Sequence, residues 1–212
     1  LNYNGYSSRK RMMLCATLLD SEFSMPDNID RTAHLWDDYI SKNLHRFRNV
    51  SHTEIAKKIR EGKPVFERVK AEKLDVKMLS KKEQTQYRKY TSSNWIKPGA
   101  EYCGTILKSQ NRQVAESFCI DLNGETLFPD NEVIRFIMGL DDGFILDNCF
   151  TKEEACEFLG QSVDIPMHKA FCRKVLKHID DYFKGAKIAA SKVSEVVAFP
   201  HVDSSGQYSL FA

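Results

Sequence analysis

The chain has 212 residues, of which 42% are hydrophobic and 11% aromatic, and its formal net charge is +2. This composition is typical of a globular protein with a buried core, and it excludes a disordered chain. Polar residues interrupt the apolar runs well before the roughly 20 residues that span a bilayer, so we expect no membrane association. The charge is unevenly distributed, because residues 1–100 carry twenty Lys or Arg against twelve Asp or Glu, whereas residues 101–212 carry eleven against seventeen.

The first half of the chain has the pattern of a series of short helices. Apolar residues recur at close to helical spacing over residues 29–47, which predicts one helix there. Ser51 and Ser80 are each followed by Glu three residues later, the capping-box pattern that begins a helix. Gly62 is expected to end the first of these two helices. We therefore expect residues 1–96 to form a mainly helical, basic region.

The pattern changes after the Pro98-Gly99 pair, which favours a boundary between two regions. Asn123-Gly124 lies between two runs rich in β-branched and aromatic residues, and this is the strongest hairpin signal in the chain. We expect an α+β fold. Its C-terminal region, residues 97–212, would hold a small antiparallel sheet with a hairpin around 114–128 and helices around 130–139, 152–159 and 165–184.

The most informative feature is a concentration of positive charge in residues 42–97, which hold sixteen Lys or Arg and six Asp or Glu. Such a surface attracts phosphates by charge and by counterion release. Aromatic residues are interspersed with the basic ones, and exposed rings can stack on unpaired bases. We therefore predict a nucleic-acid-binding protein acting in replication, transcription or genome handling. The candidate contact residues are Lys57, Lys58, Arg60, Arg68, Lys70, Lys81, Lys82, Arg88, Lys89, Tyr90 and Trp95.

Two other interpretations account for the same excess of basic residues. A run of charge is usually a solvated helix face whose side chains support their own helix. A basic face can also bind an acidic protein on the same electrostatic grounds, which would make the chain an interaction or effector module. The acidic C-terminal half could separately serve as a binding surface for a protein partner.

The sequence carries no compact catalytic signature and neither of the common glycine-rich nucleotide loops, so we expect no cofactor and no resident metal. Asp20-Ser21-Glu22 resembles the first motif of the DnaQ-like exonucleases. That resemblance implies two metal ions that activate water, which makes a metal-dependent nuclease a further alternative for the function. A thiol enzyme using Cys103 is a further alternative.

Two other features concern the cysteines and a helix pair. The six cysteines include no C-x-x-C pair, which favours buried thiols in a reducing compartment, the cytoplasm or nucleus. Cys149, Cys156, His168 and Cys172 could be considered as zinc ligands. The gap between the first two is wider than the usual two to four residues of zinc sites, so we favour buried thiols. Residues 151–162 resemble the first helix and turn of the helix-turn-helix superfamily. The segment is acidic, however, and Pro166 lies where base-reading side chains would begin.

Overall fold

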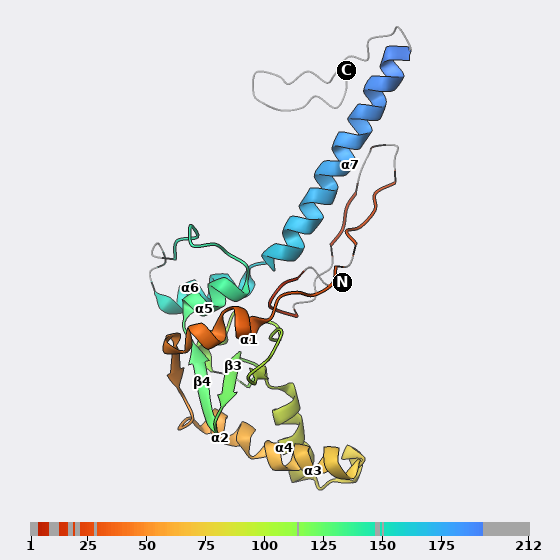
Figure 1. Cartoon of the computed structure of the whole chain (residues 1–212). Helices are drawn as coiled ribbons and strands as arrows, with labels where there is room; N and C mark the ends of the chain where they lie inside the picture. The colour runs from red at the N-terminus through yellow and green to blue at the C-terminus, as the bar shows by residue number, and fades with distance from the viewer. Residues whose placement is uncertain are drawn as a thin grey trace. The chain divides into compact units, whose positions relative to one another are not determined.

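Figure 1 presents the computed structural model of the chain. It describes residues 4–8, 13–16, 19, 22–27, 29–113, 115–146, 149 and 151–192, with side chains up to residue 185. The protein is an α+β fold, as predicted, with a small sheet among a larger number of helices. It divides into two compact units. The first contains Leu1–Met13 and Asp27–Ala170, and the second contains Leu14–Pro26 and Phe171–Ala212.

The described α-helices are α1 (Leu35–Asp38), α2 (Glu54–Arg60), α3 (Gly62–Glu72), α4 (Lys81–Ser92), α5 (Asn131–Ile137), α6 (Lys152–Gln161) and α7 (Ile165–Lys192). The described strands are β1 (Phe47–Asn49), β2 (Trp95–Ile96), β3 (Cys119–Leu122) and β4 (Glu125–Pro129). Short 3-10 turns occur at η1 (Ile40–Lys42), η2 (Leu44–Arg46), η3 (Val76–Met78) and η4 (Gln110–Arg112).

The four strands form one sheet in the order β1-β4-β3-β2. β4 pairs antiparallel with both β1 and β3, whereas β2 pairs parallel with β3. The β3–β4 hairpin turns at Asn123 and Gly124, as the sequence predicts, and both residues have positive φ angles of 49° and 83°. Two consecutive positive φ angles define the tight turn whose twist matches a hairpin. β1 and β2 both precede Pro98-Gly99, so the N-terminal half of the chain supplies the two edge strands of the sheet.

The two faces of the sheet differ in what covers them, because successive side chains of a strand point to opposite sides. One face carries Ile96 and Ile120 into the main core, where they meet buried residues of α1, α5 and α6. The other face carries Trp95, Cys119 and Phe128, which pack in a smaller cluster with Val50. This second face lies beside the basic helices, and it forms part of the candidate interface described below.

The predicted helix over residues 29–47 is wrong. Only α1 is α-helical there, and two 3-10 turns and β1 follow it. The side-chain amide of Asn43 donates to the Tyr39 carbonyl at 2.9 Å, which occupies an acceptor that a continuing helix would use. The Arg46 carbonyl accepts from the Asp130 backbone N–H. Pairing with β4 therefore overrides the helical spacing of the apolar residues.

The two predicted capping boxes have different outcomes. Ser80 and Glu83 form the reciprocal box at the start of α4. Ser51 caps no helix, because its hydroxyl accepts from the Thr126 backbone N–H at 2.8 Å. Thr53 caps α2 instead. α2 ends at Arg60, close to Gly62 as expected, but Gly62 also begins α3, with Glu61 alone between the two helices.

The second unit contains most of α7 and the described residues from 14 to 26. Phe23 contacts Phe171 and His178 edge-on, with ring centroids 5.9 and 5.4 Å apart.

Pro166 lies in the first turn of α7, where its missing N–H costs nothing. Within the described residues, no helix combines the length and apolar character that crossing a membrane requires.

Candidate nucleic-acid interface

Helices α3 and α4 pack against each other through a small aromatic cluster. The Phe66 ring lies 6.0 Å from the Tyr87 ring and 5.1 Å from the Tyr90 ring, measured between centroids. Gly62 allows this packing, since a Cβ at that position would lie 2.3 Å from the Gln86 carbonyl oxygen. Tyr90, a predicted stacking residue, is thus half-buried between the helices.

An ion pair fixes the same two helices. The Arg68 guanidinium donates to the Glu83 carboxylate at 2.5 Å, and Glu83 also accepts from the Ser80 hydroxyl at 2.6 Å. The hydrogen bonds from Ser80 and then from Arg68 lower the pKa of Glu83 to about 2. Arg68, predicted to contact phosphate, is therefore engaged in holding α3 to α4.

Arg60 points from α2 to the second face of the sheet. Its guanidinium donates to Asp121 at 3.2 Å and to the Thr126 hydroxyl at 2.8 Å. The guanidinium carbon also lies 5.8 Å from the centroid of the Trp95 ring. Lys63 lies 3.6 Å from the other Asp121 oxygen. These contacts attach α2 to the sheet, so Arg60 has a structural partner.

The remaining basic candidates are exposed. Lys57 pairs with Glu54 within its own helix at 3.2 Å. In the part of the chain that the structure describes, no ion pair engages Lys58 on α2, Lys70 on α3, or four cations on α4. We name these four the α4 stripe: Lys81, Lys82, Arg88 and Lys89.

The α4 stripe occupies one side of its helix. At about 100° per residue, its four positions and the exposed Thr85 and Ser92 fall within an arc of about 120°. The opposite side carries the half-buried Tyr87 and Tyr90. The single acidic residue of α4, Glu83, is paired with Arg68. The structure thus brings four of the predicted cations onto a single exposed face.

A row of side chains crosses the second face of the sheet. The strand register aligns Arg48 with Phe128, and Cys119 with Trp95, and the β3–β4 register places Cys119 beside Phe128. The guanidinium carbon of Arg48 lies 5.1 Å from the centroid of the Phe128 ring. Trp95 is half-buried at the other end of the row, next to the C-terminal end of α4.

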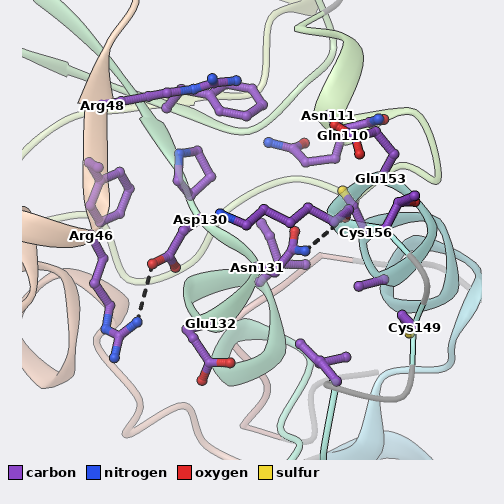
Figure 2. A pocket seen from close by; sticks show the side chains of 18 of the residues that line it. Arg46, Arg48, Gln110, Asn111, Asp130, Asn131, Glu132, Cys149, Glu153 and Cys156 are labelled. Atoms are coloured by element: carbon purple, nitrogen blue, oxygen red, sulfur yellow. Dashed lines mark hydrogen bonds and ion pairs between the residues drawn. The ribbon is translucent and has the colours of Figure 1, made fainter.

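The Arg48 end of this row opens into a cavity of about 810 Å³. Its walls come from β1, the end of β4, η4 and the residues that begin α5 and α6. Figure 2 shows Arg46 turned toward Asp130, with which it pairs at 3.1 Å, while Arg48 extends along a different wall. Asp130 also caps α5 by accepting from the Val133 backbone N–H at 3.0 Å.

Two further residues shape the cavity. Gln110 is fully buried, and its side-chain amide makes two hydrogen bonds with the Phe118 backbone, at 2.8 and 2.7 Å. Thr151 caps α6 by accepting from the Glu154 N–H at 3.0 Å. No sequence signal singles out Gln110 or brings Arg48 to Phe128.

The enzyme alternatives receive no structural support from the described residues. Cys103 is 1% exposed, and burial raises the pKa of its thiol far above the ordinary value, the opposite of an activated nucleophile. Asp20 lies outside the described residues, and Glu22 is in the second unit. Nowhere in the described ranges do three His, Cys, Asp or Glu side chains gather as metal ligands would.

The chain matches no protein-family model and no curated protein. Among solved structures, one match is the crystal structure of the S. pombe Dnmt2 methyltransferase. The alignment covers 44% of this chain and 34% of the methyltransferase chain, with 11% sequence identity and a TM-score of 0.36. The chain thus corresponds to about a third of that protein's length. An overlap of this quality establishes neither a shared fold nor a shared function.

Proposed function

We propose that the protein binds nucleic acid through the α4 stripe. The observation that carries the proposal is the gathering of four exposed cations on one face of a single helix whose only carboxylate is already paired. Phosphates along a strand form a row of negative charge, and a row of cations neutralises them with release of counterions.

The other predicted contact residues take different roles in this proposal. Lys58 and Lys70 extend the positive surface onto α2 and α3, where they are exposed. Arg60, Arg68 and Tyr90 position the helices rather than contact phosphate, because each has a partner within the fold. Trp95 stays a candidate for base stacking on the second face of the sheet, and Lys57 contributes only when its pair with Glu54 opens.

The test is a salt titration of binding to a fluorescent single strand of about 12 nucleotides, within the usual range of site sizes. We expect log Kobs to fall linearly with log salt concentration, with a slope of about 0.7 for each phosphate neutralised. The variant in which all four α4-stripe residues are changed to Ala should lose about 2.8 from that slope.

The matched control is Lys97→Ala combined with Lys108→Ala, which removes exposed cations of the first unit outside α4. This control should keep the wild-type slope. A polyglutamate chain distinguishes an acidic protein partner. If it competes with the strand at equal charge concentration, the surface recognises negative charge alone. A flat salt dependence, or equal slopes in all variants, contradicts the proposal.

A further inference from the structure

The lining of the cavity at the Arg48 end of the sheet carries three Lys or Arg and three carboxylates, and two of these cations have no ion pair among the described residues. Among its carboxylates, Asp130 is paired with Arg46, and Glu132 is paired with Arg135. No carboxylate of the described residues pairs with Arg48 or with Lys152, both of which line the cavity. Glu153 is the lining carboxylate that stands against these two cations. Arg48 and Lys152 are therefore available to a negatively charged group of a ligand.

Arg48 also provides a flat surface. One face of its guanidinium lies over the Phe128 ring, and the ring fixes the orientation of the cation. Phe128 is only 4% exposed, whereas Arg48 is exposed. The outer face of the guanidinium is thus available to a planar group. Unpaired bases stack on aromatic rings and on Arg planes in this way.

Hydrogen-bonding groups line the same cavity. The side-chain amide of Asn111 has no hydrogen-bond partner among the described residues, and it can both donate and accept. The Glu153 carboxylate can accept from a base amino group, and the Lys152 ammonium can donate to a phosphate. A cavity of about 810 Å³ falls within the range of small-ligand sites and leaves room for a nucleotide with its water.

The cavity and the proposed interface lie at opposite ends of the row across the sheet. Adjacent strands lie about 4.8 Å apart, so the three intervals from Arg48 to Trp95 span about 14 Å. Trp95 follows the end of α4 by three residues. A strand that continues from the α4 stripe past Trp95 reaches the cavity over the surface above Cys119 and Phe128, because these two residues are buried.

We propose that this cavity binds one unpaired nucleotide of the strand held by the α4 stripe. The base stacks on Arg48, its edge faces Asn111 and Glu153, and a phosphate lies near Lys152. This inference rests on the proposed function, and it adds to it the recognition of a base, which phosphate contacts alone do not provide.

The first test separates stacking from charge. Arg48→Lys keeps the charge and removes the plane, so it should retain the salt slope while weakening binding of the single strand about tenfold. Arg48→Ala should weaken binding at least as much. Arg112→Ala is the control, since Arg112 is an exposed arginine of η4 that does not line the cavity. Full affinity in Arg48→Lys, with the salt slope intact, overturns the nucleotide site and leaves the proposed function standing.

The second test locates the ligand directly, even if the Arg48 variants fold poorly. Cys149 lines the cavity and is half-buried, whereas the half-buried Cys172 lies in the second unit. Maleimide labelling of the wild-type protein, resolved by peptide mass spectrometry, should slow severalfold at Cys149 and stay constant at Cys172 when the strand saturates the protein. An unchanged Cys149 rate with bound strand overturns the nucleotide site alone.

Free nucleotides form the last arm of the test, which also covers failure of the proposed function. If no strand binds, the labelling is repeated with a millimolar mixture of the four nucleoside monophosphates. Protection of Cys149 then assigns the cavity to a free nucleotide and overturns the strand-linked site. Absence of protection overturns the cavity as a nucleotide site of either kind.

Discussion

Replacing Gly62 with Ala tests the close approach of the α2–α3 junction to α4. The added Cβ would lie 2.3 Å from the Gln86 carbonyl oxygen and 2.8 Å from the Tyr90 Cβ. Ordinary contacts begin near 3.4 Å, so the junction must move by about 1 Å. Overpacking of this kind costs about 1–3 kcal/mol. The clash with a backbone oxygen at 2.3 Å places the cost in the upper part of that range, about 2–3 kcal/mol. The better helix propensity of Ala returns up to about 1 kcal/mol, which leaves a net destabilisation of about 1–2 kcal/mol.

The assay is urea unfolding followed by circular dichroism, with Gly185→Ala as the control. Nothing lies within 4 Å of a Cβ at Gly185, so the same chemical change should leave stability equal or raise it. Because the α4 stripe lies on one helix, Gly62→Ala should also keep most of the salt slope. A Gly62→Ala protein that unfolds at the wild-type urea concentration would refute the packing described for α3 and α4.

Three other experiments, two with substitutions and one with labelling, test the structure described above. Since the pKa of Glu83 is lowered from 4.5 to about 2, its contribution is present above pH 4.5 and is lost as pH falls toward 2; thermal unfolding of Glu83→Gln should lack that pH dependence. Asp121→Asn should destabilise the protein by about 1–3 kcal/mol in urea unfolding, because Arg60 and Lys63 then lose a carboxylate that is 9% exposed. A wild-type midpoint would show that these two ion pairs do not stabilise the fold. Cys103 should resist maleimide until the protein unfolds, since burial raises its pKa and hides it; labelling in the native state at the rate of Cys149 would contradict its placement.

The sequence predicts correctly those elements whose hydrogen bonds form between residues close together in the chain. The Ser80–Glu83 box and the Asn123-Gly124 turn are both present, because each satisfies its own backbone groups. The segment 29–47 failed for the opposite reason. Its apolar spacing is helical, but β4 offers its backbone partners that lie more than 80 residues away in the sequence.

The site was predictable to the same extent. The excess of cations in residues 42–97 is a property of the sequence, and α4 does present four of them together. The sequence could not tell which cations would be engaged by distant carboxylates. Arg60 meets Asp121 and Arg68 meets Glu83 only after the helices dock. The cavity depends equally on strand register, which alone places Arg48 over Phe128.

Lysine footprinting locates the bound strand most directly. Brief acetylation of the wild-type protein, with and without a saturating single strand, reports the accessibility of each ammonium group by mass spectrometry. We predict that Lys81, Lys82 and Lys89 become several times less reactive when the strand is present, while the exposed Lys97 and Lys108 react as before. Equal reactivity of α4 with and without bound strand would contradict the central claim.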